Sequence, residues 1–303
     1  MTNKEIYKEY LSRLINLYDA NEAAAITNLV FESIAGLKRF DIVRDPQQSV
    51  GAITFAKLDR CLAELLQHKP VQYVLGEAWF YNMKLKVKEA VLIPRPETEE
   101  LVQLVVDDYK SLSKNNPLNK NETADAELLY GEIKTISILD IGTGSGCIAI
   151  SLAKTLAEAK ILALDVSAEA LSVAKENATD QSADIVFFQL DFLVEDNWKS
   201  LPMLDVIISN PPYIPESEIS KLERNVIAFE PHTALFVPEQ TPLIFYEKIA
   251  KFGKSHLNKN GRIYVEINQD LPTETKKVFE PYYSVKIKKD IFGKDRKLIA
   301  TVS

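Results

Sequence analysis

The chain has 303 residues, 46% of them hydrophobic, and a formal net charge of −7. This acidic balance argues against direct nucleic-acid binding, because nucleic-acid binders gain much of their affinity by neutralising phosphates with basic side chains. No stretch approaches the roughly 18 apolar residues of a membrane span, and the polar N-terminus, Met1 to Glu5, has no signal-peptide core. We therefore expect a cytoplasmic protein of two domains without membrane association.

Cysteine and histidine are rare in the sequence. Cys61 and Cys147 lie far apart, so we expect no disulfide framework, in keeping with a reducing compartment. The three histidines, His68, His232 and His256, show no metal-ligand spacing with each other or with the cysteines. The sequence therefore predicts no metal site.

The first part of the chain has the apolar spacing of helices. Apolar side chains recur at helical intervals in residues 3–18, in the stretch after Asp19 and in residues 54–66. The run Asp19-Ala20-Asn21-Glu22 resembles a capping box, in which reciprocal hydrogen bonds begin a helix. We interpret residues 1–70 as a small helical domain. It either serves only as a packing unit or recognises a partner, and the sequence alone favours neither.

Residues 71–93 connect this domain to the rest of the chain, and the partial alternation in residues 83–93 predicts a β-hairpin. The run Pro94-Arg95-Pro96-Glu97-Thr98-Glu99 follows, and proline with acidic residues is typical of the first turn of a helix. Helix initiation leaves Arg95 unexplained, so this helix end is a candidate ligand-facing segment. Further on, the polar residues 111–127 predict a surface loop.

From Ile136 onward, predicted strands and helices alternate. The strands are expected at 136–141, 160–165, 185–189, 204–209, 261–267, 283–288 and 297–302, and helices near 146–158, 167–178 and 241–257. The short turn at 292–296 joins the last two strands as a hairpin, which makes the last strand antiparallel. Residues 94–303 are therefore expected to form an α/β domain with a Rossmann-like, seven-stranded, mostly parallel sheet.

One predicted strand ends in a distinctive turn. Residues 204–208 form an apolar run typical of a parallel strand buried on both faces. The chain continues as Asn210-Pro211-Pro212-Tyr213, and the two prolines cannot donate hydrogen bonds to the sheet, so the strand must stop. The turn thus lies at the carboxyl end of a strand, the edge where open α/β sheets bind ligands.

The groups in this turn suit a planar amino group. Pro211 and Pro212 are rigid, and their carbonyl oxygens can face a ligand. Asn210 offers an amide acceptor and two donors, and Tyr213 offers a flat face for stacking. We take the turn as a candidate site for the –NH2 of an amide or a base. The alternative is an ordinary strand-to-loop turn, and the rest of the chain must decide between them.

A glycine-rich loop is the second candidate site. A predicted strand runs into Gly142-Thr143-Gly144-Ser145-Gly146, and a predicted helix follows. Glycines let the backbone approach a ligand closely. Asp165, at the end of the next strand, lies 19 residues after Gly146, which suits an acid that hydrogen-bonds ribose hydroxyls. Together these features predict a nucleoside-binding site.

Cys147 helps to choose the nucleoside, because a dinucleotide-binding loop would have its third glycine there. A pyrophosphate ligand is therefore less well supported than S-adenosylmethionine, which carries no phosphate. Asp140 and the glycine loop would hold its amino-acid end, and Phe192 would stack on its adenine. The alternative for Phe192 is a place in the hydrophobic core.

The glycine loop, Asp165 and the Asn-Pro-Pro-Tyr turn together resemble class I S-adenosylmethionine-dependent methyltransferases that act on amino groups. Four further stretches narrow the resemblance to the release factor glutamine methyltransferases, the PrmC/HemK family. They are Pro-Val-Gln-Tyr (70–73), Ile-Pro-Arg-Pro-Glu-Thr-Glu (93–99), Phe-Glu-Pro (229–231) and Glu-Ile-Asn-Gln (266–269). The match covers nearly the whole chain, and residues 93–99 are its most discriminating part.

The resemblance implies methyl transfer from S-adenosylmethionine to the glutamine amide in the Gly-Gly-Gln motif of class 1 peptide chain release factors. It implies that residues 1–70 recognise this substrate. It further implies cofactor contacts from Gly142, Thr143, Gly144, Ser145, Gly146, Asp165, Phe192 and Asn210, substrate contacts from Arg95, Glu97, Asn210, Pro211, Pro212 and Tyr213, and catalytic roles for Asn210, Pro211 and Tyr213.

Other functions stay open at the level of sequence. A ribosomal-protein glutamine methyltransferase or an adenine amino methyltransferase of nucleic acid would share the Asn-Pro-Pro-Tyr turn, although the acidic balance disfavours the second. A non-catalytic binding module would be expected to have a damaged turn or glycine loop, and both are intact. Cys147 disfavours a nicotinamide dehydrogenase. Nothing in the sequence demands an oligomer, so we expect a monomer.

Overall fold

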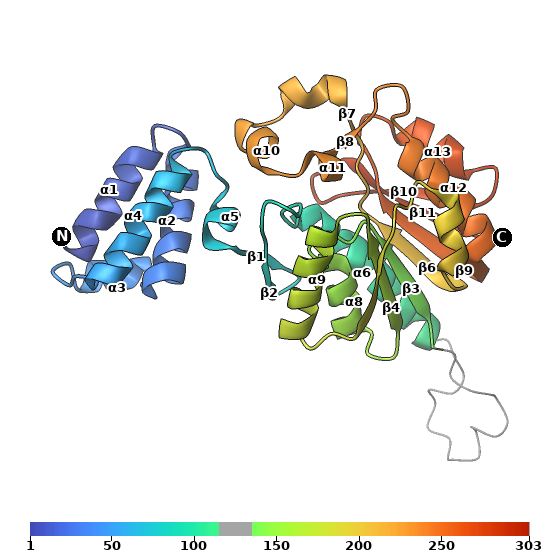
Figure 1. Cartoon of the computed structure of the whole chain (residues 1–303), viewed down its shortest axis with the longest axis horizontal. Coiled ribbons are helices and arrows are strands. Elements are labelled where there is room, and N and C mark those ends of the chain that lie inside the picture. Colours follow the sequence, from blue (N-terminus) through green and yellow to red (C-terminus); the bar gives the residue numbers. More distant parts are fainter. Residues whose placement is uncertain (115–134, 303) are drawn as a thin grey trace, which may run out of the picture. The chain divides into compact units, whose positions relative to one another are not determined.

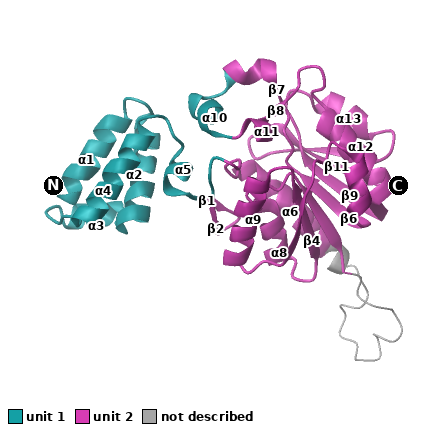
Figure 2. Cartoon of the chain, in the orientation of Figure 1, with its two compact units in different colours: residues 1–77, 87–89, 221–230 teal, residues 78–86, 90–220, 231–303 magenta. Residues whose placement is uncertain are grey.

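The structure, a computed structural model, describes residues 1–114 and 135–302. The chain divides into two compact units (Figure 2). Unit 1 consists of residues 1–77, 87–89 and 221–230, and unit 2 of residues 78–86, 90–220 and 231–303.

Unit 1 is built of helices. They are α1 (Asn3–Leu14), α2 (Ala20–Ala35), α3 (Arg39–Arg44), α4 (Ala52–Leu65), α5 (Val71–Leu75) and α10 (Arg224–Phe229). A capping box between Thr2 and Glu5 begins α1, and the side chain of Asp19 caps α2 by accepting a hydrogen bond from the backbone N–H of Glu22 at 3.0 Å. The three predicted helices are thus present. The short helices α3 and α5 were not predicted, because they show too little of a periodic pattern.

Aromatic packing holds the first helices of unit 1 together. Phe31 of α2 is fully buried, and its ring meets the rings of Tyr7 and Tyr10 of α1 edge-on, with centroids 5.3 Å apart in both pairs. Leu58 and Leu65 of α4 are also fully buried in this core. Such edge-to-face contacts add about 0.5–1.5 kcal/mol beyond the burial of area. Packing therefore supports helices whose propensity alone would be marginal.

Unit 2 is organised around a seven-stranded sheet with the order β10-β11-β9-β6-β3-β4-β5 (Figure 1). Its strands are β3 (Ser137–Ile141), β4 (Lys160–Asp165), β5 (Ile185–Gln189), β6 (Leu204–Ser209), β9 (Leu257–Glu266), β10 (Ser284–Lys289) and β11 (Asp295–Thr301). All pairs are parallel except those that β11 forms with β9 and β10. The predicted mostly parallel sheet with an antiparallel last strand is confirmed, although β9 begins at Leu257 and not at residue 261.

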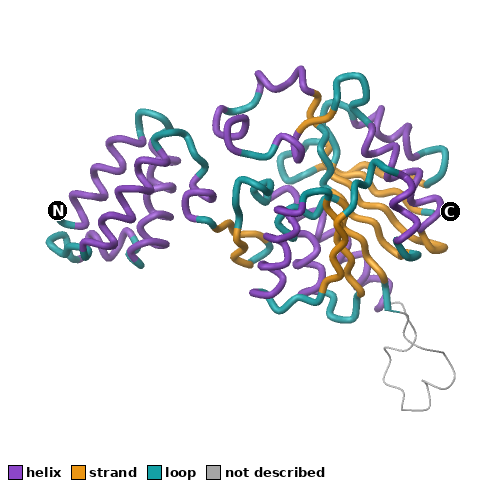
Figure 3. Tube along the Cα trace, in the orientation of Figure 1, coloured by secondary structure: helices purple, strands orange, loops and turns teal. Residues whose placement is uncertain are grey.

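Helices cover both faces of this sheet (Figure 3). Among its described residues, unit 2 contains the helices α6 (Pro96–Lys114), α8 (Cys147–Thr155), α9 (Ala168–Asp180), α11 (His232–Leu235), α12 (Ile244–His256) and α13 (Pro272–Phe279). It also contains the 3₁₀ helix η2 (Glu195–Ser200) and all of η3 (Glu216–Lys221) except its last residue. Successive side chains of a strand point to opposite faces. Ile138 and Ile208 therefore pack with α6 and α8, whereas Leu139 and Ile207 pack with α12 and α13.

A hairpin of β1 (Glu77–Phe80) and β2 (Met83–Lys86) precedes the sheet in the chain. Its turn consists of Tyr81 and Asn82, with φ angles of +49° and +62°. Two positive φ values match the twist of the flanking strands. The hairpin lies within the predicted connector, residues 71–93, but it begins before residue 83, where the alternation starts, because Tyr-Asn lacks the glycine that usually marks such a turn.

Helix α6 continues to Lys114, so the surface loop predicted for residues 111–127 does not begin at residue 111. The remainder of that prediction falls on residues outside those that the structure describes. Within residues 1–114 and 135–302, no helix combines the length and the apolar composition that crossing a membrane requires.

Candidate active site

The two loops singled out in the sequence leave the sheet side by side. Strands β3 and β6 are parallel neighbours, and Ile141 is paired with Ser209. The Ser209 hydroxyl also donates to the carbonyl oxygen of Ile141 at 2.7 Å. Gly142 and Asn210 follow these two residues, so the glycine loop and the Asn-Pro-Pro-Tyr turn begin at the same point of the sheet's carboxyl edge. Open α/β sheets bind their ligands at this edge.

A chain of hydrogen bonds holds Asn210. Its Nδ2 donates to Oγ1 of Thr98 at 3.1 Å, and the Thr98 hydroxyl donates to Oε2 of Glu266 at 2.8 Å. The other carboxylate oxygen, Oε1, accepts a hydrogen bond from the Tyr213 hydroxyl at 3.0 Å. Thr98 lies in the first turn of α6, Glu266 ends β9, and Asn210 and Tyr213 belong to the turn after β6. Three separate elements therefore meet at Asn210.

Two further side chains hold the end of the turn. Arg296 of β11 donates from Nη1 to the Tyr213 hydroxyl at 3.2 Å, and Asn268 donates from Nδ2 to the Tyr213 carbonyl oxygen at 3.2 Å. Pro211 is buried, and Pro212 is partly exposed. The turn is therefore fixed by contacts with neighbouring elements as well as by the stiffness of its prolines.

Burial dominates the electrostatics of this group. Glu266 is only 3% exposed, and burial raises the pKa of its carboxyl. The hydrogen bonds from Thr98 and Tyr213 act in the opposite direction on this pKa, as does the charge of Arg296. Burial also raises the pKa of the Tyr213 phenol, and the charge of Glu266 raises it further. Tyr213 therefore stays protonated at neutral pH and donates its hydrogen bond to Glu266.

Arg95 and Glu97 lie at the start of α6, close enough to affect these titrations. The charge of Glu97 raises the pKa of Glu266, whereas the charge of Arg95 opposes the rise in the pKa of Tyr213. Both side chains are partly exposed. The structure thus brings them near the Asn-Pro-Pro-Tyr turn, and their contact with a substrate stays a prediction.

Four members of this group, Thr98, Glu266, Asn268 and Arg296, were not among the predicted site residues. Thr98 and Glu266 belong to two of the stretches that carry the family resemblance, 93–99 and 266–269. Their place in these stretches was therefore an available signal. Arg296 follows the turn of the final hairpin and belongs to no motif that the sequence reveals.

The glycine loop has the backbone conformation that its composition predicts. Gly142, Gly144 and Gly146 have φ angles of +74°, +55° and +82°, in the left-handed region that favours glycine. Asp165, at the end of β4, holds the loop, because its Oδ2 accepts a hydrogen bond from the N–H of Gly144 at 2.9 Å. Its Oδ1 accepts another from the N–H of Ser167 at 2.9 Å. A contact of Asp165 with ribose stays a prediction.

Asp140, near the end of β3, is fully buried. Its Oδ2 accepts a hydrogen bond from the hydroxyl of Thr143 at 2.7 Å, whereas Oδ1 has no hydrogen-bond partner among the described residues. Burial raises the pKa of Asp140 to about 7. An unpaired buried oxygen next to a glycine loop fits a ligand that brings a cation or a donor, as the amino-acid end of S-adenosylmethionine does. Thr143 and Ser145 of the loop are themselves buried.

Alanine is expected to act differently at two of these glycines. An added Cβ at Gly146 would lie 3.0 Å from Cδ1 of Ile150 and 3.2 Å from Cβ of Ala174. Crowding then adds to the unfavourable φ, so Gly146→Ala should lower the free energy of unfolding by roughly 2 kcal/mol. At Gly144, apart from the two neighbouring residues in the chain, no atom of the described residues lies within 4 Å of the added Cβ. Gly144→Ala should therefore cost only about 1 kcal/mol of stability.

The same methyl group at Gly144 would enter the space proposed for the cofactor, and we expect about tenfold weaker binding of S-adenosylhomocysteine. Urea-induced unfolding measures the stability of both variants, and isothermal titration calorimetry measures the affinity. Unchanged affinity in Gly144→Ala would contradict a cofactor-binding role for this part of the loop.

Phe192 lies in the hydrophobic core. Its ring is part of a cluster with Trp198 and Phe252, at centroid distances of 5.5 Å and 5.4 Å, and the residue is 4% exposed. Its carbonyl oxygen accepts a hydrogen bond from the indole N–H of Trp198 at 2.8 Å. These contacts are those of a core residue, the alternative that the sequence left open. Stacking of Phe192 on adenine gains no support from them and stays a prediction.

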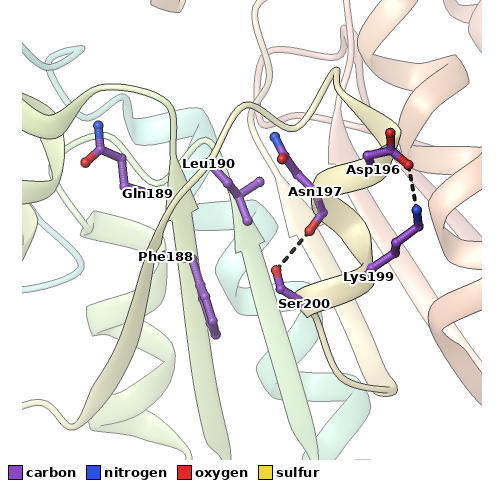
Figure 4. A pocket seen from close by; sticks show the side chains of 7 residues that line it. All are labelled: Phe188, Gln189, Leu190, Asp196, Asn197, Lys199 and Ser200. Carbon is purple, nitrogen blue, oxygen red and sulfur yellow. Dashed lines mark hydrogen bonds and ion pairs between the residues drawn. The ribbon is translucent and has the colours of Figure 1, made fainter.

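A groove of about 530 Å³ lies beside β5 and η2 (Figure 4). It is lined by Phe188, Gln189, Leu190, Asp196, Asn197, Lys199 and Ser200. Within η2, Lys199 pairs with Asp196 at 2.7 Å. None of the predicted site residues lines this groove, so it is not part of the candidate site.

Two protein-family models match the chain, the PrmC N-terminal domain over residues 5–76 and the Methyltransferase small domain over residues 124–230. Among solved structures, the hMettl16 catalytic domain in complex with MAT2A 3′UTR hairpin 6 has a similar fold. Its TM-score is 0.51 at 14% sequence identity, over 83% of this chain and 82% of that one. The matched models, the fold and the glycine loop define an S-adenosylmethionine-dependent methyltransferase.

Curated relatives narrow this class. The chain is 38% identical over 298 residues to a release factor glutamine methyltransferase of Flavobacterium psychrophilum, with 98% of each chain covered. It is 39% identical over 289 residues to a release factor glutamine methyltransferase of Bacteroides thetaiotaomicron, with 95% of each chain covered. The chain belongs to the release factor glutamine methyltransferase family, as the resemblance in its motifs implied.

Proposed function

We propose that the protein transfers a methyl group from S-adenosylmethionine to the side-chain amide nitrogen of the Gly-Gly-Gln glutamine in class 1 peptide chain release factors. The observation that carries this proposal is the pairing of Ile141 with Ser209, which starts the glycine loop and the Asn-Pro-Pro-Tyr turn at one point of the sheet edge. A methyl donor on the first loop and an amide on the second would lie next to each other. The names of the family members supply a release-factor glutamine as the substrate, and the resemblance of the sequence motifs supplies the Gly-Gly-Gln motif of class 1 factors.

The nucleophile in this reaction is weak, because an amide nitrogen shares its lone pair with its carbonyl group. Oδ1 of Asn210 and the carbonyl oxygen of Pro211 each accept one N–H of the glutamine amide. This fixes the nitrogen and directs its lone pair toward the methyl group. Such positioning can supply about 7–11 kcal/mol of a barrier. Bound S-adenosylmethionine supplies an electrophilic methyl group on its sulfonium.

Tyr213 packs against the plane of the glutamine amide in this proposal. Its hydroxyl is held by Glu266 at 3.0 Å and by Arg296 at 3.2 Å, which supports a single orientation of the ring. After methyl transfer the amide nitrogen releases one proton, which restores the neutral amide. The mechanism needs no histidine, cysteine or serine nucleophile.

The proposal assigns a task to each segment of the chain. Residues 1–70 recognise the release factor, residues 71–93 connect, and residues 94–303 transfer the methyl group. The protein acts in the cytoplasm, where translation terminates, as a monomer and without direct binding to nucleic acid. The net charge of −7 supports the last point.

Mass spectrometry of a class 1 release factor, incubated with the protein and S-adenosylmethionine, tests the proposal. We expect one added methyl group on the Gly-Gly-Gln glutamine, and none on a release factor in which that glutamine is replaced by alanine. If the release factor stays unmodified while a ribosomal-protein glutamine or an adenine amino group is methylated, the substrate is one of these alternatives. If nothing is methylated although S-adenosylhomocysteine binds, the proposed activity is wrong.

A further inference from the structure

The amide of Asn210 has two orientations that are nearly equal in shape and opposite in chemistry. With Oδ1 toward the substrate, it accepts an N–H of the glutamine amide. With Nδ2 toward the substrate, it would set a donor against a donor. The proposed function therefore requires one orientation, and the surrounding protein has to select it.

The selection can be followed outward from Glu266. An ionised carboxylate only accepts hydrogen bonds, so the Thr98 hydroxyl, 2.8 Å from Oε2, has to donate its proton to it. The Thr98 oxygen is then left with lone pairs alone toward Asn210, and only Nδ2 can donate to it, at 3.1 Å. Oδ1 of Asn210 consequently points away from Thr98.

We propose that Thr98 and Glu266 are positioning residues that orient the Asn210 amide so that its Oδ1 faces the substrate. This inference rests on the proposed function and deepens it, because it names what aligns the hydrogen-bond acceptor. Neither residue touches the reacting atoms, and both act through Asn210.

Both positioning residues are buried and lie on regular elements. Thr98 is 2% and Glu266 3% exposed, so water competes little for their hydrogen bonds. In the first turn of α6, the N–H of Thr98 donates to the carbonyl oxygen of Arg95 at 3.1 Å. Glu266 is the last residue of β9, a strand that has neighbours on both sides in the sheet. A hydrogen bond between two rigid elements fixes geometry better than one made by loops.

The same carboxylate directs a second residue of the site. Arg296 can only donate hydrogen bonds, and its Nη1 lies 3.2 Å from the Tyr213 hydroxyl. The hydroxyl oxygen of Tyr213 therefore accepts from Arg296, and its proton goes to Oε1 of Glu266 at 3.0 Å. The positive charge of Arg296 also favours the ionised form of Glu266. One carboxylate thus sets the direction of the hydrogen bonds of both Asn210 and Tyr213.

Thr98→Val removes the hydroxyl and keeps the volume and branching of the side chain. We expect kcat/KM for a release factor to fall about 10- to 100-fold, the size of effect that misplacement of a reacting group produces. Affinity for S-adenosylhomocysteine should not change. Thr98→Ser keeps the hydroxyl and should stay within about threefold of the wild type.

Thr275→Val is the matched control. Thr275 of α13 is fully buried, and its hydroxyl donates to the carbonyl oxygen of Leu271 at 2.8 Å. This substitution removes a buried threonine hydroxyl at another place in the same unit, so kcat/KM should not change.

A second measurement separates orientation from loss of packing. A release factor with glutamate in place of the motif glutamine offers acceptors where the substrate offers N–H donors, so the wild-type protein should bind it poorly as a competitive inhibitor. In Thr98→Val the Asn210 amide can turn and present Nδ2. In the wild type, the inhibition constant of the Gly-Gly-Glu factor should be much larger than the KM of the Gly-Gly-Gln factor. In Thr98→Val we expect the ratio of these two constants to be about tenfold smaller. If Thr98 had only a structural role, Thr98→Val would weaken the binding of both release factors by the same factor, and the ratio would not change.

The outcomes distinguish this inference from the proposed function. If the wild-type protein does not methylate a release factor, the proposed function fails before any variant is made. If the wild type is active, a Thr98→Val rate within about threefold of it, or an unchanged ratio between the two factors, overturns the inference alone. Should Thr98→Val not fold, Glu266→Gln decides, because its amide can donate to Thr98 and release the constraint. For Glu266→Gln we expect the same fall in kcat/KM and the same decrease in the ratio of the inhibition constant to KM. Undiminished activity of this variant overturns the inference.

Discussion

Replacing Asn210 with alanine is expected to lower kcat/KM for a release factor by about 100- to 1,000-fold. The variant loses the amide oxygen that we propose accepts an N–H of the substrate glutamine, and the carbonyl of Pro211 alone would not fix the nitrogen. Affinity for S-adenosylhomocysteine should fall by less than about threefold, because Asn210 is only one of the expected cofactor contacts and the glycine loop and Asp165 are untouched. Steady-state methylation of a purified release factor measures the first effect, and calorimetry measures the second.

Asn258→Ala is the matched control for this prediction. Asn258 lies at the amino-terminal end of β9, at the opposite end of the sheet, where its Nδ2 donates to Oδ1 of Asp205 at 2.9 Å. Its removal deletes one asparagine hydrogen bond without touching the Asn-Pro-Pro-Tyr turn, so turnover should not change. Near wild-type turnover by Asn210→Ala would mean that methyl transfer does not depend on this amide, and the mechanism would be wrong.

The sheet and the positions of the two candidate ligand loops could be predicted because their signals are local. A buried parallel strand is a short apolar run, a pair of prolines ends it, and a row of glycines marks a loop with positive φ. Strands β4, β5 and β6 have the bounds that the sequence predicts, and β3 differs by one residue at its start. Each of these features is contained in a few consecutive residues.

The contacts that orient Asn210 were not predictable in this way, because its partners are remote in the sequence. Thr98 and Asn210 are 112 residues apart, and Thr98 and Glu266 are 168 residues apart. A motif indicates that a stretch matters, but it does not show which side chain donates to which. That depends on how α6 packs on the sheet and where β9 ends.

Short elements form the second gap between sequence and structure. β7 (Ile214–Pro215) and β8 (Phe236–Val237) contain two residues each, and α13 contains eight. Recognition of a period needs a window of roughly 11 or more residues. These elements form through tertiary contacts, and no local sequence pattern predicts them.

Asparagine in place of Asp140 is expected to remove a pH dependence of stability. The pKa of Asp140 is about 7 in the folded protein and 3.8 in an ordinary aspartate, so between these values the unfolded chain binds fewer protons. The stability of the wild type therefore falls as the pH rises. Between pH 5 and pH 8, the free energy of unfolding of the wild type should decrease by roughly 2–3 kcal/mol relative to that of Asp140→Asn. Urea-induced unfolding at each pH measures the difference.

A substitution of Thr143 tests the direction of this pH dependence. The hydrogen bond of the Thr143 hydroxyl to Asp140, at 2.7 Å, lowers the pKa that burial raises. Thr143→Val should therefore raise the pKa of Asp140 further and shift the loss of stability to higher pH. A difference between the wild type and Asp140→Asn that stays constant from pH 5 to pH 8 would contradict the raised pKa.

The same carboxylate should link stability to cofactor binding. An ammonium group within about 4–6 Å of a carboxylate favours its ionised form, and the unpaired Oδ1 of Asp140, near the end of β3 and beside this loop, can receive one. S-adenosylhomocysteine should then bind the wild type more tightly at pH 8 than at pH 6, by up to about tenfold, and Asp140→Asn with equal affinity at both. Equal affinities of the wild type at pH 6 and pH 8 would mean that Asp140 does not interact with the amino group of the ligand. A higher affinity at pH 8 would explain why an aspartate with one unpaired oxygen lies beside the glycine loop. The ligand would then offset the cost of burying the Asp140 charge in the free protein.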